Sequence, residues 1–550
     1  MADMRLAGTQ LKVVRILAGN PLTKGVMWAV TSKDFKIAEL MALPASDRHP
    51  VNDSARPVQG APPRRWGADD APVPGRTDGC TSAELTAAYR AGRTDPVAVL
   101  DRALARVKAN DFGPATNSPF IALDEGPARE AAAASAKRHR DGRSIGALDG
   151  VPVCVKDEVD LVGHDTLGGT TYLRGNPANA DSWVVTKLRE AGAVVYAKSH
   201  CPEWGLNPLG ISQFYDFPRN AWRNDRGAGG SSTGTGVATA IGLAPVGLGS
   251  DGGGSIRIPS ATNGVFGIKP TYIRIGRTGD LWGPGTMPHL GPLGRSTADL
   301  VEFLAATAGV DPQDGTSSMQ SDAPVAGWRA ALTRSIKGCR IGIVQSEWKD
   351  TDTAIADAGM NALDALAKEG AVLVDVKIPL AIHAPAVGAL TIASESTANI
   401  SDDVVNYRDQ FGEEMLAISA FLSNVSAREF LAAQRTRAAM RRQVATVLAG
   451  VDVLALPVMA RFPVPYALTE SRQAIMDTGF TAGMTRFAFL GNLTGLPAGS
   501  IPVGLHDGLP IGLQIMADAW DEASVFAVMA ACERAEISAL PACPGFKSLL

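Results

Sequence analysis

Short apolar strands that alternate with amphipathic helices are the feature that most limits how this chain can fold. SWVVTKLREAGAVVYAKS, from Ser182 to Ser199, predicts a helix and then a strand. Between Lys337 and Leu380, KGCRIGIVQ, AIADAGMNALDALAKEG and AVLVDVKIPL predict a strand, a helix and a second strand. Helices that regularly alternate with strands imply helices on both faces of a parallel sheet. We therefore predict an α/β fold with a mixed, mostly parallel central β-sheet.

Residues 43–79 divide the chain into two parts. They are rich in proline, glycine, alanine and arginine, as in PASDRHP, RPVQGAPPRRWG and APVPG. This composition resists regular structure and is typical of an exposed connector. Thr81 and Glu84 then form a capping-box pattern that predicts a helix start. We expect residues 1–79 to be a helical extension with a proline-rich connector, and residues 80–550 to be a single large domain.

The N-terminal segment LKVVRILAG predicts a helix with Leu11, Val14 and Leu17 on one face. Two interpretations remain open for its apolar face. In one, the helix makes a weak contact with a membrane surface or with a partner subunit, because basic residues outnumber acidic ones in this part of the chain. Alternatively, it packs on the body of its own chain, which is the interpretation that we favour.

The composition excludes several classes of protein. The 550 residues carry a formal net charge of -4, so no broad basic surface for nucleic acid is expected. No uninterrupted apolar run reaches the roughly 18 residues that cross a bilayer. The 6 cysteines are widely scattered, with no CxxC pair and no histidine cluster at ligand spacing, so neither a disulfide framework nor a zinc site is indicated. Without a secretory signal pattern, we expect a cytoplasmic location.

A stretch rich in glycine and serine, from Gly229 to Pro259, contains ten glycines. A flexible linker is excluded because VATAIGLAPVGLG within it is apolar and predicts a helix followed by a strand. Phosphate binding lacks support because no GxxxxGK[ST] string occurs. Consecutive glycines before Ser255 instead allow several backbone N–H groups to converge on one point. This arrangement predicts an oxyanion hole with a hydroxyl group at its edge.

A serine nucleophile needs a base to accept its proton. None of the seven histidines lies in a recognisable triad pattern. Lys156 ends the apolar run VPVCV, and burial of a lysine favours the neutral amine, which is a competent base. The alternative is that Lys156 forms a surface ion pair with Asp157 or Glu158.

Three blocks of sequence resemble the amidase signature family: GVPVCVKDEVD, GGSSTGTG and GSDGGGSIRIPSATNGVFGIKPT. Further similarity extends from about Thr81 to Pro510 and includes VDVLALPV and NLTGLPAGSIPVGLHDGLPIGLQI. Within the family, DGGGSIRIPS, TTYLRG and DFPRN are most similar to plant-type fatty acid amide hydrolases and their bacterial relatives. The resemblance implies a single large amidase-signature domain.

The resemblance also implies a catalytic triad. Ser255 would be the nucleophile that accepts the acyl group. Ser231, preceded by a cis peptide bond, would relay a proton between Ser255 and Lys156, and Lys156 would be the base. No cofactor or metal would be required.

Further roles follow from the same resemblance. The oxyanion hole would consist of the backbone N–H groups of Gly252, Gly253, Gly254 and Ser255. Ser232 would support the hydrogen-bond chain, while Asp251 and Arg257 would hold the glycine loop in shape. Thr233 and Thr235 replace the glycine or serine of many members. For these two threonines and Ser232, capping of the following helix is an equally open interpretation.

The implied activity is hydrolysis of the C–N bond of a linear amide, with release of an acid and of ammonia or an amine. Two alternatives remain open: the ammonia-generating glutaminase component of a tRNA-dependent amidotransferase, and a non-catalytic scaffold at a membrane surface. The extra N-terminal segment argues against the amidotransferase component. For the assembly state, we leave a homodimer open.

The resemblance leaves the substrate open among fatty acyl and aryl amides, esters and carbamates. We expect residues 161–220 and 287–291 to line the acyl pocket. The aromatic candidates for its walls are Tyr172, Trp204, Phe214, Tyr215, Phe217, Trp222 and Trp282.

Overall fold

The computed structural model describes residues 5–20, 23–25, 28, 33, 36–44, 66, 78–283, 285–320 and 322–550. Most of the predicted connector at residues 43–79 lies outside these ranges. The predicted capping box is confirmed at the start of α4 (Ser82–Arg90). There the Thr81 N–H donates to Glu84 Oε2 at 3.0 Å, and the Glu84 N–H donates to Thr81 Oγ1 at 3.2 Å.

A large central sheet organises the described part of the chain. Its 11 strands lie in the order β2-β4-β3-β5-β7-β6-β12-β13-β10-β8-β9. The bounds of these strands are β2 (Phe120–Leu123), β3 (Pro152–Lys156), β4 (Val194–Ser199), β5 (Val246–Asp251), β6 (Phe266–Lys269), β7 (His289–Gly294), β8 (Arg340–Ile343), β9 (Val372–Asp375), β10 (Val453–Pro457), β12 (Ala498–His506) and β13 (Leu509–Ala517).

The sheet is mixed, and the predicted α/β fold is confirmed. Strands β4, β3 and β5 are parallel to one another, as are β10, β8 and β9. The other neighbouring pairs are antiparallel. Parallel pairing therefore occurs where helices and strands alternate in the sequence, whereas the middle of the sheet contains a hairpin. Asp507 and Gly508 connect β12 to β13 and both have positive φ, as a two-residue hairpin turn requires.

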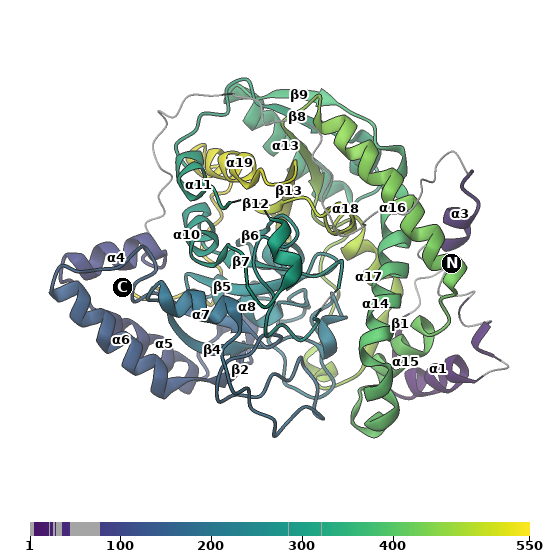
Figure 1. Ribbon diagram of the computed structural model, residues 1–550, viewed down its shortest axis with the longest axis horizontal. Coiled ribbons are helices and arrows are strands. Elements are labelled where there is room, and N and C mark those ends of the chain that lie inside the picture. Colours follow the sequence, from purple (N-terminus) through teal and green to yellow (C-terminus); the bar gives the residue numbers. More distant parts are fainter. Residues whose placement is uncertain are drawn as a thin grey trace.

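Helices cover both faces of the sheet (Figure 1). Successive strand residues point to opposite faces, so Val153 and Cys154 belong to different apolar clusters. The face of Val153 is covered by α7 (Trp183–Glu190), α10 (Thr297–Thr307), α11 (Val325–Ala331), α12 (Gln345–Trp348), α13 (Thr353–Lys368) and α19 (Glu522–Arg534). The face of Cys154 is covered by α4, α5 (Pro96–Lys108), α6 (Glu125–Arg140) and α8 (Thr233–Ala240).

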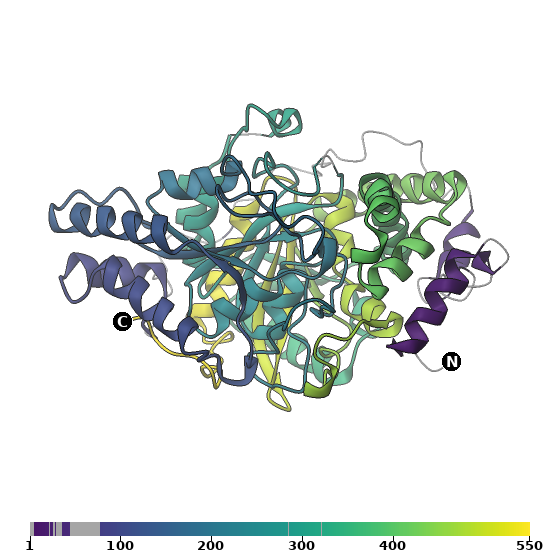
Figure 2. The ribbon, with the colours of Figure 1, turned by 90° about the horizontal axis from the view of Figure 1, so that it is seen from below.

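A second group of helices packs where β10 and β13 turn their side chains to the face opposite α19. Leu454 and Met516 of these strands share a cluster with α14 (Ala384–Asn406), α16 (Ala427–Leu448) and α18 (Phe489–Thr494). Three further helices of the body are α9 (Arg257–Asn263), α15 (Glu413–Leu422) and α17 (Thr478–Thr485). The two ribbon views place α4–α6 at one end of the molecule and α14–α16 at the other (Figure 2).

The N-terminal segment packs on the body of its own chain, beside α14–α16 (Figure 1). Strand β1 (Arg5–Ala7) pairs with β11 (Ile475–Asp477), and α1 (Thr9–Gly19) packs on α15. Leu11, Val14 and Ala18 of α1 are buried in this contact. Leu17, predicted on the same face, is instead 37% exposed, because the buried side of the helix includes Ala18. A short helix, α3 (Ile37–Met41), contacts α14 and α16.

Candidate active site

Two parallel strands bring the predicted base to the glycine loop. β3 and β5 lie side by side with Val155 opposite Leu248, so both strands end at the same edge of the sheet. Lys156 is the last residue of β3, and Ser250 is the last but one of β5. This register places the lysine beside the start of the loop that carries Ser255.

Lys156 is fully buried and has three polar neighbours. Its Nζ donates to Ser231 Oγ at 2.8 Å and to Ser250 Oγ at 2.7 Å. The same atom lies 3.0 Å from Glu158 Oε2, and Glu158 is also fully buried. The alternative that Lys156 forms an ion pair at the surface is therefore wrong, because its ion pair with Glu158 lies inside the protein. Asp157 forms a separate buried pair with Lys198, at 2.9 Å.

Ser231 follows a cis peptide bond from Gly230, as the resemblance implied. The neighbouring Ser232 connects this segment to the glycine loop. Its hydroxyl donates to the Ser250 carbonyl at 3.1 Å and accepts from the Ser250 N–H at 3.2 Å. Its own N–H donates to the Ser255 carbonyl at 3.2 Å. The Ser232 side chain makes no cap bond to α8, and its hydroxyl instead holds the Ser250 backbone.

The two threonines after Ser232 do not contact the predicted triad through a hydrogen bond. Thr235 Oγ1 donates to the Leu248 carbonyl at 2.9 Å and lies 2.7 Å from Ser199 Oγ. The hydroxyl of Thr233 is buried and has no hydrogen-bond partner among the described residues. Thr235 thus fastens α8 to β5.

Three of the four predicted oxyanion donors are available. Gly252, Gly253 and Ser255 line a cavity, and none of their N–H groups donates to another described residue. Gly254 differs from the prediction. Its N–H donates to Asp251 Oδ1 at 2.7 Å, so this donor is already engaged in another hydrogen bond. The Ser255 hydroxyl makes no hydrogen bond within the described ranges, and the residue lines the same cavity as Ser231.

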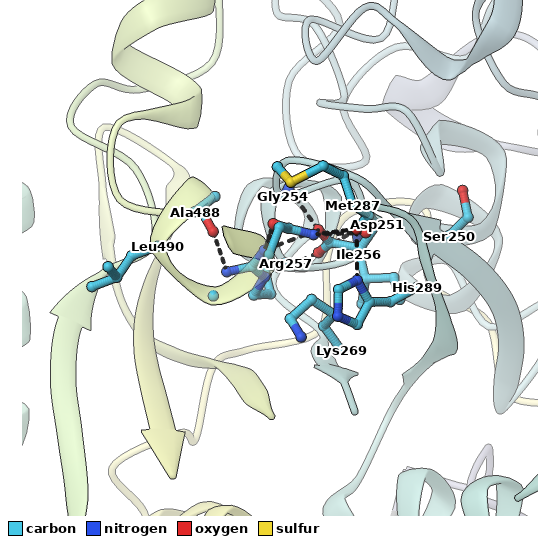
Figure 3. A network of polar contacts seen from close by, with 12 residues as sticks. Ser250, Asp251, Gly254, Ile256, Arg257, Lys269, Met287, His289, Ala488 and Leu490 are labelled. Carbon is cyan, nitrogen blue, oxygen red and sulfur yellow. Dashed lines mark hydrogen bonds and ion pairs between the residues drawn. The ribbon is translucent and has the colours of Figure 1, made fainter. Parts of the chain in front are cut away.

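A buried ion pair anchors this loop from behind (Figure 3). Asp251 Oδ1 lies 2.9 Å from Arg257 Nη2, and both side chains are fully buried. Burial alone would raise the pKa of Asp251, but Arg257, Lys269 and Asn492 together outweigh burial and hold this pKa below its usual range. The supporting role that the resemblance implied for Asp251 and Arg257 agrees with these contacts.

Distant side chains complete the anchor. Arg257 Nη1 donates to the Ala488 carbonyl at 2.9 Å, and Nη2 donates to Asn492 Oδ1 at 2.6 Å. Asn492 Nδ2 donates in turn to the Asp251 carbonyl at 2.7 Å. Gln514 accepts from Arg257 Nη1 at 2.5 Å. Asn492 and Gln514 lie in a block that resembles the family, more than 200 residues after Arg257, but nothing in that block indicated a contact with the glycine loop.

His289 lies near the anchor in Figure 3 but does not form a triad. Its Nδ1–H donates to the Met287 carbonyl at 2.7 Å. Burial, reinforced by the charge of Lys269, lowers the pKa of His289 well below its usual range. The ring is therefore neutral, and its Nδ1–H is engaged with the backbone.

The cavity in front of Ser255 has a volume of about 190 Å³ and mostly apolar walls. α14, α15 and the segment around α17 supply much of the wall. The apolar residues that line it are Trp28, Ile37, Leu206, Pro208, Trp282, Met287, Pro288, Ala389, Ile392, Ala393, Ile418, Phe421, Leu422, Met476 and Phe489.

The predicted wall is correct only in part. Trp282 is the one aromatic candidate that lines the cavity among the described residues. From the two predicted ranges, residues 205, 206, 208, 287 and 288 also line it. The other six aromatic candidates do not line it; Tyr172, for example, stacks on Tyr407 and Phe411. Residues of α14 and α15 replace them, and no motif in those helices indicated this role.

Acidic side chains interrupt the apolar wall. Glu395 accepts hydrogen bonds from the N–H and the hydroxyl of Thr286. Glu414 accepts from Asn207 Nδ2 at 2.7 Å, and burial raises the pKa of Glu414 to about 8. Glu414 is therefore protonated at neutral pH, which lowers the cost of placing it beside apolar groups.

Comparisons with known proteins agree with this geometry. The sequence model of the Amidase family matches residues 99–526. A glutamyl-tRNA(Gln) amidotransferase component from Chloroflexus aurantiacus is 33% identical over 474 residues, which span 82% of this chain and 95% of the relative. The fatty acid amide hydrolase of Medicago truncatula is 30% identical over 458 residues, 81% of this chain and 75% of the relative.

A solved structure is similar in fold. A bacterial aryl acylamidase of the amidase signature enzyme family superposes with a TM-score of 0.74 at 25% identity, over 85% of this chain and 98% of the other. Within the described residues, no helix is long and apolar enough to cross a membrane.

Proposed function

The chain belongs to the amidase signature family of amide-hydrolysing enzymes, and we propose that it cleaves amides with an apolar acyl or aryl group through an acyl-enzyme on Ser255. The observation that carries this proposal is the contact of the buried Lys156 with Ser231, at 2.8 Å, beside a loop of free backbone donors. Residues 80–550 would form the catalytic unit, with the first 79 residues as an extension.

The proposed reaction begins with proton transfer along the triad. Ser255 attacks the amide carbonyl while its proton passes to Ser231, and the proton of Ser231 passes to a neutral Lys156. The N–H groups of Gly252, Gly253 and Ser255 stabilise the negative charge that develops on the carbonyl oxygen. The relay in reverse protonates the leaving nitrogen, the C–N bond breaks, and water hydrolyses the acyl-enzyme. No metal or cofactor takes part in this scheme.

The walls of the cavity support an apolar acyl group. Burial of a CH₂ group is worth about 0.8 kcal/mol, so each methylene that reaches the wall should strengthen binding. Trp28 and Ile37 precede the part of the chain that matches the family, yet they line the cavity. The extension would therefore take part in substrate selection.

Glutamine hydrolysis is the alternative suggested by the amidotransferase relatives. Glutamine is a polar amino acid whose charged groups require charged or polar partners, and the cavity is lined mainly by apolar side chains. This favours the amidase over the ammonia-generating amidotransferase component. A scaffold without activity would not need the contact between Lys156 and Ser231.

A hydrolysis screen tests the proposal. Acyl amides from acetyl to long-chain, an aryl amide and glutamine are incubated with the full chain, and released ammonia or amine is measured. We expect kcat/KM to rise with acyl length by up to about tenfold for every two methylene groups until the cavity is filled. A preference for glutamine over every apolar amide would overturn the proposed substrate class.

A further inference from the structure

The mechanism described above leaves one buried titratable group at the triad without a role. Glu158 lies two residues after Lys156 and is fully buried. Its Oε2 atom is 3.0 Å from Lys156 Nζ and accepts the hydroxyl hydrogen of Ser250. Ser250 in turn accepts from Lys156 at 2.7 Å, so the three side chains form a closed set of contacts.

The surroundings of Glu158 leave it little else to bind. Its Oε1 atom is buried and has no hydrogen-bond partner among the described residues. Gly205 lies against this oxygen, and a Cβ at that position would come within 2.1 Å of it. The carboxylate is thus closely packed, and its polar contacts within the described residues are with Lys156 and Ser250.

Other charged groups near the triad are already balanced by partners of their own. Asp157 pairs with Lys198 at 2.9 Å, Asp280 with Arg277 at 3.0 Å, and Asp251 with Arg257 at 2.9 Å. Cys201 is buried, and burial raises the pKa of its thiol well above the usual range, so it carries no charge at neutral pH. Glu158 therefore supplies the negative charge that directly contacts Lys156.

We propose that Glu158 is a positioning residue that stabilises the ammonium group formed when Lys156 takes the proton of Ser231. In this step the Ser255 O–H bond breaks and an Oγ–carbon bond forms, while the carbonyl π electrons move onto oxygen. One proton moves from Ser255 to Ser231, and one from Ser231 to Lys156. The new positive charge then lies 3.0 Å from the Glu158 carboxylate, which orients the amine and increases its basicity.

This inference rests on the proposed function and deepens it. A carboxylate that contacts the base has two effects that can be measured separately. It strengthens the base, which raises the maximal rate, and it favours the protonated lysine, which places the acid limb of the pH profile at higher pH. Removing the carboxylate should reverse both effects. A purely structural role would lower the maximal rate without moving the limb.

The experiment measures the rate at which a fluorophosphonate labels Ser255 in the full chain between pH 5 and 10. In Glu158→Gln, which keeps the size of the side chain and loses its charge, we expect the plateau rate to fall roughly 10²-fold. We also expect the acid limb to move to lower pH by about one pH unit. Glu158→Asp keeps a carboxylate, so its limb should stay near that of wild type.

Control variants separate the possible failures. Glu522→Gln removes a carboxylate of equal burial that pairs with Arg274 away from the triad, and its limb should match wild type. If Glu158→Gln does not fold, Ser250→Ala carries the test, because it removes an acceptor of the ammonium group and should move the limb the same way. An unchanged limb, or one at higher pH, would overturn the role of Glu158. Failure of wild type to be labelled would instead overturn the proposed function.

Discussion

Asp251 offers a direct test of how the oxyanion loop is held. Its carboxylate accepts five hydrogen bonds, from Gly254 N at 2.7 Å, Ile256 N at 3.2 Å, Arg257 Nε at 3.0 Å, Arg257 Nη2 at 2.9 Å and Asn492 Nδ2 at 2.9 Å. Asp251→Asn keeps the shape of the side chain, but one oxygen becomes an NH₂ group that cannot accept these donors. The Arg257 guanidinium then remains buried without its counter-charge.

Two magnitudes follow from this geometry. Breaking a fully buried ion pair from one side costs about 3–5 kcal/mol of stability, because the remaining charge is uncompensated. The loop also loses the bond that holds Gly254, so Gly252, Gly253 and Ser255 are no longer fixed around the reacting carbonyl. Loss of one well-placed oxyanion donor typically costs roughly 10²–10³ in turnover, which sets the expected fall in the labelling rate of Ser255.

Glu522→Gln is a matched control for this variant. Glu522 and Arg274 form a pair at 3.1 Å with both side chains fully buried, and Glu522 also accepts from Thr271 N at 3.0 Å. Urea unfolding should show a similar loss of stability in both variants, whereas fluorophosphonate labelling of the folded protein should fall only in Asp251→Asn. Equal labelling rates in the two variants would refute the claim that Asp251 organises the loop.

Three further predictions concern the cavity and the triad. Gly205→Ala places a Cβ within 2.1 Å of Glu158 Oε1 and 3.0 Å of Ser231 Oγ, so labelling should fall by more than about tenfold; Gly163→Ala, also at positive φ but in open space, should label normally. Burial raises the pKa of Glu414 to about 8, so its contribution to stability is complete below about pH 4.5 and is lost as pH rises to about 8. The free energy of unfolding of wild type should thus fall over this range, relative to that of Glu414→Gln, by up to about 1.4 kcal/mol per pH unit. Parallel curves of unfolding free energy against pH for the two proteins would contradict this. Trp28→Ala should lower kcat/KM for long acyl amides more than for acetyl amides, while the exposed Val13→Ala should change neither.

Local patterns in the sequence were sufficient to predict the parallel sides of the sheet, a candidate lysine base and a serine at a glycine-rich loop, whereas the role of Ser231 came only from the family resemblance. Lys156 ends a short apolar strand, and Ser255 follows three glycines, so each residue type and its setting pointed to a chemical role. For Glu158 the sequence suggested only a surface partner of Lys156. Glu158 lies in the turn after β3, where the two-residue alternation of a strand no longer applies, so this alternation could not have indicated the internal contact.

Other features depend on contacts between distant segments, which the sequence alone does not indicate. Asn492 and Gln514 reach Arg257 only because β13 and α18 pack against α9 and the glycine loop. The part of the cavity wall formed by α14 and α15 could not be predicted either, because its residues are of the same types as those on any buried helix face. The availability of Gly252, Gly253 and Ser255, in contrast to Gly254, depends on where the Asp251 carboxylate points.

The measurement that tests the central claim most directly is the site of covalent labelling in the full chain. A fluorophosphonate should attach to Ser255, as located by peptide mass spectrometry, and Lys156→Met should lower the labelling rate by at least about 10²-fold while the protein remains folded. Attachment at another residue, or unchanged labelling of a folded Lys156→Met protein, would contradict a serine nucleophile activated by a buried lysine.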